Sequence, residues 1–145
     1  MADPRGSGTE GIRVTRVFDA PRELVWREWT EPEAFADWFG GPAYEVPLDT
    51  VSMDVRPEGA LRLTMIGPDR REIHWKGEYR VVEKPVRLVF TLSDRPGAAY
   101  ELVTVVLTVL GDGRRTEMLF TQHGHMTPEG YEHAAQGWGG FFDRI

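Results

Sequence analysis

The alternation of apolar and polar residues predicts a first strand over residues 12–18. Ile12, Val14 and Phe18 fall on one side of an extended chain, and mostly polar residues fall on the other. The segment before it is small, polar and rich in glycine, so few of its side chains could hold it in place. We therefore expect a disordered lead-in over residues 1–11 and one folded domain over 12–145.

A helix is predicted directly after this strand. Pro21 suits the first helical turn, because its φ angle is already helical and its missing N–H is not needed there. Leu24, Val25 and Trp29 form the apolar stripe that would face the core.

A second short helix is predicted to follow. Thr30 and Glu33 have the spacing of a capping box, in which the Thr30 side chain would accept from the backbone N–H of Glu33. The helix is expected to end at Trp38 and Phe39, where the Gly40–Pro42 segment stops it.

Six further strands are predicted between residues 44 and 123. Turn-forming residues separate them, for example at 67–69, 94–97 and 111–113. The strands are expected over 44–54, 60–66, 72–83, 86–93, 100–110 and 114–123. Their short connections predict an antiparallel meander.

The last segment predicts a long amphipathic helix, with Thr127 as N-cap and Pro128 in the first helical position. Apolar side chains recur at helical spacing at Tyr131, Ala134, Ala135, Trp138, Phe141, Phe142 and Ile145. Gly137, Gly139 and Gly140 interrupt this segment, and each costs about 1 kcal/mol relative to alanine. We expect close approach of the helix to the sheet, or to a ligand between them, to offset that cost. Together the elements predict an α+β fold.

Composition narrows the class of partner. The net charge is −6 with both signs mixed along the chain, so the basic face that nucleic acid needs is not expected. The absence of cysteine excludes disulfides, thiolate zinc sites and cysteine nucleophiles. The longest apolar runs are strand-sized, so no membrane span is expected, and the first residues lack the apolar core of a signal peptide. A cytoplasmic location is expected by default, no cofactor is expected, and exposed sheet edges leave a homodimer open.

Six short motifs, in order along the chain, carry a resemblance to a known family. They are Ala20-Pro21 with Val25-Trp26, Trp38-Phe39 with Gly40-Gly41-Pro42, Met53 to Gly59, Gly77-Glu78-Tyr79, Pro85 to Phe90, and Gly137-Trp138. From about Ile12 to Ile145 the chain resembles the helix-grip fold of the START-like (SRPBCC) superfamily. Within it, the chain resembles the homologues of the C-terminal domain of the activator of heat-shock chaperone ATPase. That branch usually has two glycines in the third motif, where this chain has Glu58 before Gly59.

The resemblance implies a curved antiparallel sheet of about seven strands around the C-terminal helix, with a cavity between them. The function it implies first is binding of a small hydrophobic or amphipathic ligand in that cavity. Two alternatives stay open: a cyclase- or aromatase-like enzyme in the same cavity, and a chaperone-interaction module. The co-chaperone uses an additional N-terminal domain, and none is expected before the strand predicted to begin at residue 12. A chaperone role is therefore the least expected of the three.

Aromatic residues supply the predicted cavity wall. Trp75 and Tyr79 share one side of a strand, and Trp138 and Phe142 lie one turn apart on the last helix. The expected wall residues are Trp38, Phe39, Trp75, Tyr79, Phe90, Phe120, Trp138 and Phe142. A packed aromatic core is the alternative for any one of them. Solid packing between sheet and helix, with no cavity above roughly 300 Å³, would contradict the pocket hypothesis.

A few polar side chains are candidates for the polar part of this pocket. They are Arg62, Tyr79, Tyr100, Gln122 and His123. His123 and Tyr79 are also the candidates for proton transfer if the cavity holds an enzyme site. The strand carboxylates, among them Glu78, Glu101 and Glu117, are instead expected in solvated pairs with strand arginines.

The histidines near the start of the last helix have a metal-binding alternative. His123 and His125 would point to the same side of an extended chain, and His133 could join them. Gly124 and Thr127 indicate, however, that the strand is already ending there. We therefore expect solvated histidines before a helix cap, and no metal site.

Overall fold

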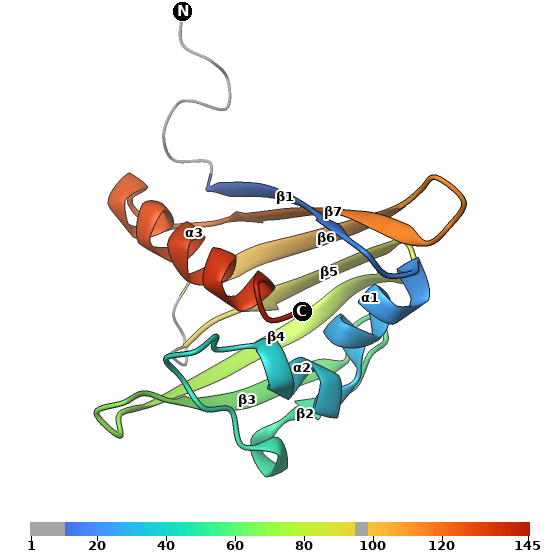
Figure 1. The fold of residues 1–145 in the computed structure, drawn as a ribbon. Helices are drawn as coiled ribbons and strands as arrows, with labels where there is room; N and C mark the ends of the chain where they lie inside the picture. The colour runs from blue at the N-terminus through green and yellow to red at the C-terminus, as the bar shows by residue number, and fades with distance from the viewer. Residues whose placement is uncertain (1–10, 95–98) are drawn as a thin grey trace, which may run out of the picture.

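The computed structural model describes residues 11–94 and 99–145 (Figure 1). The predicted lead-in over 1–11, apart from Gly11, lies outside the described residues, as does most of the predicted turn at 94–97. Within the described ranges the chain forms a seven-stranded antiparallel sheet and three α-helices. The α+β helix-grip class is confirmed.

The strands pair in the order β1-β7-β6-β5-β4-β3-β2, so β1 and β2 form the two edges. Their bounds are β1 (Ile12–Phe18), β2 (Ser52–Met53), β3 (Ala60–Ile66), β4 (Glu72–Glu83), β5 (Arg87–Leu92), β6 (Glu101–Leu110) and β7 (Arg115–His123). The helices are α1 (Arg22–Thr30), α2 (Pro32–Trp38) and α3 (Pro128–Phe142). The helices lie on one face of the curved sheet, with α3 over the β1–β7 side (Figure 1). Within the described residues, no helix combines the length and apolar character needed to cross a bilayer.

The predicted strand over 44–54 is wrong for most of its length. Glu45 makes only an isolated bridge to Ile66, and a 3₁₀ turn, η2 (Leu48–Thr50), follows before the short β2. Pro47 cannot donate to a sheet ladder, and its carbonyl accepts from both the backbone N–H and the hydroxyl of Thr50. These local bonds replace a continuous ladder.

The first two helices differ from the sequence-based prediction in two details. Leu24 is exposed, and Trp26 is buried with Val25 and Trp29. The predicted capping box is also wrong, because Thr30 is the last residue of α1 and its hydroxyl donates to the carbonyl of Trp26. The cap of α2 is Glu31, which makes no side-chain capping bond.

The N-terminus of α3 forms as predicted. Thr127 accepts from the backbone N–H of Gly130 at 3.0 Å, and Pro128 begins the helix. The close approach expected at the helix glycines is not found. A Cβ at Gly137 or Gly140 would have no neighbour within 4 Å, and one at Gly139 would meet only the Arg16 guanidinium at 3.7 Å. The sheet therefore does not require glycine at these positions.

The core is centred on Trp29, whose side chain is 1% exposed. Its ring lies 4.7 Å from Trp38 of α2, 6.1 Å from Phe120 of β7 and 6.2 Å from Trp138 of α3, between ring centroids. Phe142 lies 6.0 Å away. Aromatic residues from the sheet and from all three described helices therefore meet in one cluster.

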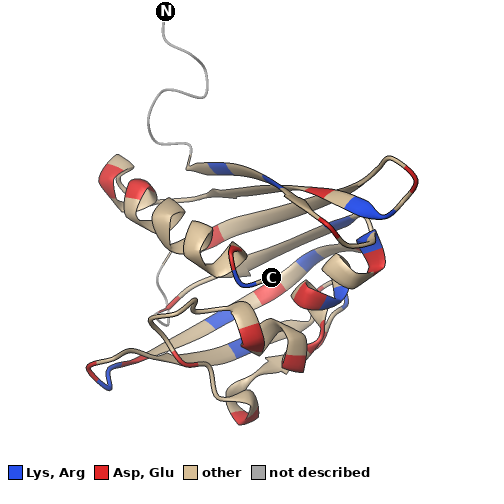
Figure 2. Cartoon of the chain, viewed as in Figure 1, with Lys and Arg blue, Asp and Glu red and all other residues tan. Residues whose placement is uncertain are grey.

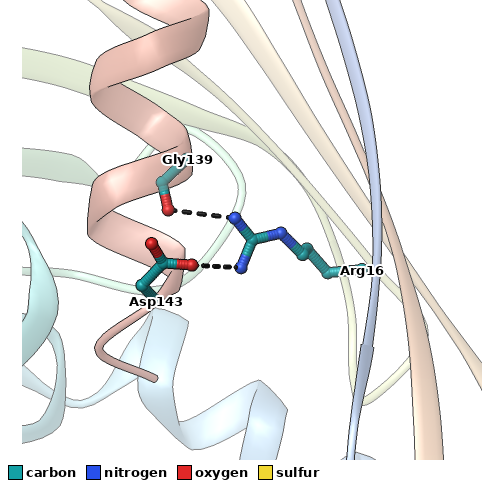
Figure 3. Close-up of polar contacts among 3 residues, drawn as sticks. All are labelled: Arg16, Gly139 and Asp143. Atoms are coloured by element: carbon teal, nitrogen blue, oxygen red, sulfur yellow. Dashed lines mark hydrogen bonds and ion pairs between the residues drawn. The ribbon is translucent and has the colours of Figure 1, made fainter.

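Arg16 of β1 holds the C-terminal end of α3 (Figure 3). Its guanidinium donates to the carbonyl of Gly139 at 3.0 Å and to the carboxylate of Asp143 at 2.8 Å. It also lies 5.9 Å from the centre of the Phe142 ring. The Gly139 carbonyl also accepts from the backbone N–H of Asp143, and a cation at this end interacts favourably with the dipole of the helix.

We predict that Arg16→Met lowers the free energy of unfolding by about 1–2 kcal/mol, because it removes both hydrogen bonds and keeps the apolar stem. Asp143→Asn is the matched change, and it should cost less than about 0.5 kcal/mol, because the Asp143 side chain is 69% exposed. Urea denaturation of both variants measures the difference. Equal losses would contradict the prediction that the bond from Arg16 to the Gly139 carbonyl stabilises the fold more than the exposed pair with Asp143 does.

Glu58 adopts a left-handed conformation, with φ of +72°, in the turn between β2 and β3. This is the position at which the resemblance implied a glycine. A side chain at positive φ costs about 1–2 kcal/mol relative to the usual conformation. The backbone N–H of Glu58 donates to the carbonyl of Tyr79 at 2.7 Å, which holds the turn against β4.

We predict that Glu58→Gly raises the free energy of unfolding by about 0.5 kcal/mol, since relief of strain exceeds the extra unfolded-state entropy of glycine. Glu58→Ala retains the Cβ and should give no gain. Chemical denaturation of the two variants tests this. A loss of stability in the glycine variant would show that the turn is not strained.

Candidate functional site

A cavity of about 150 Å³ lies between the sheet and the part of α3 that runs from Ala134 to Phe141. Its lining is largely apolar and comes from α3, from strands β3 to β7 and from the segments that follow α2 and β7. The lining residues are Phe39, Met65, Trp75, Leu92, Glu101, Gln122, Met126, Ala134, Gly137, Trp138 and Phe141. We call this space the inner cavity.

An outer depression of about 300 Å³ adjoins the inner cavity. The two share four lining residues, Trp75, Leu92, Glu101 and Met126. The depression continues to residues of the β5–β6 connection and to His125. A molecule in the inner cavity could therefore reach solvent on this side.

The inner cavity is smaller than the roughly 300 Å³ expected for a ligand pocket. The reason lies in the C-terminal end of α3, where Phe142 packs 5.2 Å from Phe120 and 6.0 Å from Trp29, between ring centroids. Interlocked rings fill that part of the gap. The inner cavity lies where α3 carries the small residues Ala134 and Gly137 beside Trp138 and Phe141.

The structure divides the predicted wall residues into two groups. Phe39, Trp75 and Trp138 line the inner cavity. The other residues contribute to the packed core instead, and they are Trp38, Tyr79, Phe90, Phe120 and Phe142. The packed-core alternative therefore describes the surroundings of these five side chains.

A chain of hydrogen bonds forms the polar end of the inner cavity. The indole N–H of Trp138 donates to Gln122 Oε1 at 2.7 Å, and Gln122 Nε2 donates to Glu101 Oε1 at 3.1 Å. Because an indole N–H can only donate, it fixes the orientation of the Gln122 amide. Gln122 is 4% exposed and Glu101 is 9% exposed, so both lie inside the fold.

Glu101 also anchors the connection from β7 to α3. Its Oε2 accepts from the backbone N–H of His125 at 2.8 Å. The hydroxyl of Tyr131 accepts from the backbone N–H of Met126 at 3.4 Å and is hydrogen-bonded to Glu101. Burial, and then this hydrogen bond, raise the pKa of the Tyr131 hydroxyl, so it remains a donor to the carboxylate. The carboxylate thus joins β6, β7 and the first turn of α3.

The expectation that Glu101 forms a solvated cross-strand pair is wrong. Glu101 shares the inward side of β6 with Val103, Val105 and Leu107, all of which are buried. That alternation was readable in the sequence and marks Glu101 as an inward-facing carboxylate. Gln122 was correctly placed among the inward polar candidates, on the same side of β7 as Phe120.

A family model described as Activator of Hsp90 ATPase homolog 1-like protein matches residues 19–145. The chain belongs to this family. The match covers every described element except β1, and therefore the whole of the inner cavity.

Solved structures show the same fold. A protein from Chromobacterium violaceum is 22% identical, with 93% of each chain covered and a TM-score of 0.82. A family protein from Silicibacter pomeroyi is 19% identical, with 92% of each chain covered and a TM-score of 0.80. One from Nitrosomonas europaea is 24% identical over 93% of this chain and 90% of that chain, with a TM-score of 0.78. No curated protein matches the chain at significant similarity.

The candidates for proton transfer in this family member lie away from the inner cavity. His123 is exposed, and its partner across the sheet is Leu102, on the side of β6 opposite Glu101. Tyr79 is buried, and burial followed by the charge of Asp54 raises the pKa of its hydroxyl far above the usual range. Its hydroxyl has no hydrogen-bond partner among the described residues.

The remaining polar candidates are on the surface. Tyr100 is 46% exposed and lies under the guanidinium of Arg80, 5.4 Å from the ring centre, while Arg62 is exposed on β3. His125 and His133 are also exposed. Among the residues that the structure describes, no group of three acidic or histidine side chains could hold a metal ion.

Proposed function

We propose that this family member binds a small, mainly apolar molecule in the inner cavity. The observation that carries the proposal is a largely apolar space between sheet and helix with a buried carboxamide and carboxylate at one end. Pockets that bind small molecules combine an apolar lining with a few placed polar groups. The likeness to START-like proteins, which hold such molecules between sheet and helix, supports it.

The volume limits the size of the molecule. A cavity of about 150 Å³ accepts a ligand as large as benzene in other proteins. The outer depression would admit a substituent that extends past Trp75 and Met126. A single ring with a short substituent, of about six to ten non-hydrogen atoms, therefore fits better than a lipid chain or a steroid.

The glycine at position 137 supports the same proposal. Gly137 is an exposed residue of the cavity lining, and a Cβ there would meet nothing within 4 Å. Its cost to helix stability is about 1 kcal/mol, and an open ligand space beside the helix is a reason to keep the position small. Gly140 has equally open surroundings but does not line the inner cavity.

The two alternative functions stay predictions. A cyclase- or aromatase-like enzyme would need a proton-transferring group at the cavity, and Glu101 rather than His123 or Tyr79 is the titratable side chain there. Stimulation of a chaperone is suggested by the family description alone, and no feature of the described surface favours it over ligand binding.

We predict that toluene binds the wild-type protein with a dissociation constant on the order of 1 mM or below, which suits a ligand of this size. Gly137→Leu should weaken binding at least tenfold, because a large side chain at this exposed position of the lining obstructs the cavity. Gly140→Leu is the matched control, since it gives a similar gain in helix propensity outside the cavity. Isothermal titration calorimetry measures all three. Undetectable binding to wild type, or equal binding to both leucine variants, would overturn the proposal.

A further inference from the structure

The hydrogen-bond donors of the cavity lining are already in use. The indole N–H of Trp75 donates to the sulfur of Met65 at 2.9 Å, and that of Trp138 donates to Gln122 at 2.7 Å. The Gln122 amide directs its two hydrogens to Glu101 Oε1 at 3.1 Å and to the sulfur of Met126 at 3.9 Å. No other side-chain N–H or O–H donor belongs to the described lining of the inner cavity.

Acceptors, in contrast, remain available. An ionised carboxylate offers about four acceptor sites, and the contacts of Glu101 with Gln122, His125 and Tyr131 use three of them. A polar group that enters the cavity therefore finds an acceptor at Glu101. It finds no free donor within the described lining.

The charges of the residues around the inner cavity also disfavour an anionic ligand. No Lys or Arg is among the described residues that line the inner cavity or the outer depression. The first turns of α3 carry Glu129, Glu132 and His133, and no Lys or Arg (Figure 2). An anionic ligand would bring a second negative charge next to a buried carboxylate, which is unfavourable in a low-dielectric site.

The aromatic rings that line the inner cavity favour a cationic ligand. Trp75, Trp138, Phe39 and Phe141 line the inner cavity. The negative face of an aromatic ring attracts an ammonium group, most strongly when the group is out of water. A carboxylate beside several rings is thus a suitable environment for an organic amine.

We propose that the ligand of the inner cavity is a small primary amine with a compact apolar body, whose ammonium group hydrogen-bonds to Glu101. This inference rests on the proposed function and specifies its ligand class. The apolar body lies between Met65, Trp138 and Ala134, and the ammonium lies at the Glu101 end, where the inner cavity meets the outer depression. Fatty acids and other carboxylate-headed molecules are excluded by the same arrangement.

A series of probes with one ring and different polar groups tests the assignment. Toluene, benzyl alcohol, benzylamine and benzoate differ in charge and donors at nearly constant size. Benzylamine should bind wild type at least tenfold more tightly than benzyl alcohol, because a hydrogen bond to a charged group is worth more than one between neutral groups. Benzoate should bind more weakly than toluene.

Glu101→Gln removes the charge and retains one acceptor, for His125, while the acceptor for Gln122 is lost. In this variant benzylamine affinity should fall about tenfold more than toluene affinity does, because toluene makes no hydrogen bond to residue 101. Glu117→Gln is the matched control. Glu117 lies on the same sheet, opposite Val17 of β1 and Thr108 of β6, and its side chain is on the sheet face away from the cavity. It should leave both affinities unchanged.

The outcomes distinguish this inference from the function on which it rests. If toluene binds and benzylamine shows no preference over benzyl alcohol, the amine assignment is overturned and the proposed function stands. If no probe binds the wild-type protein, both the amine assignment and the proposed function are wrong. Should Glu101→Gln not fold, a wild-type crystal structure with benzylamine decides: a nitrogen within about 3.2 Å of a Glu101 oxygen supports the assignment, and any other orientation overturns it.

Discussion

The packing of the Trp29 ring is the constraint on which the rest of the structure depends. Trp29 lies on α1, and it contacts rings from α2, from α3 and from the sheet. Because these elements meet at one side chain, the position of α3 over the sheet is set near its C-terminus. Arg16 of β1 stabilises the same end of α3 through hydrogen bonds to the Gly139 carbonyl and the Asp143 carboxylate. The helix is thus held tightly where its large aromatic residues lie.

The rest of α3 is held in a different way. Its N-terminal connection is tied to the sheet by the Glu101 carboxylate, through the backbone of His125 and the hydroxyl of Tyr131. Between these two attachments the helix lines the inner cavity with the small residues Ala134 and Gly137, of which Gly137 is exposed to solvent. The inner cavity is therefore a consequence of side-chain size along one helix, with a packed cluster at one end and a buried polar network at the other.

Much of this arrangement could be predicted from the sequence. The alternation of apolar and polar residues predicted the observed bounds of β3 and β4, and the Thr127-Pro128 pair predicted the start of α3. The order of the short motifs gave the fold. Local bonds were harder to predict: the Pro47–Thr50 turn replaced a strand, and Thr30 bonded back into α1. Glu101 was missed because strand carboxylates usually face solvent, although its parity with Val103 and Val105 indicates the interior. The division of aromatic residues between core and cavity depends on three-dimensional packing that no spacing rule supplies.

A crystal structure under xenon pressure tests the central claim most directly, because xenon enters apolar cavities of this size without any specific contact. The account predicts a xenon peak between Met65, Ala134 and Trp138, with none beside Phe120 or Phe142. A site without xenon, with side chains collapsed into the space beneath Gly137, would contradict it.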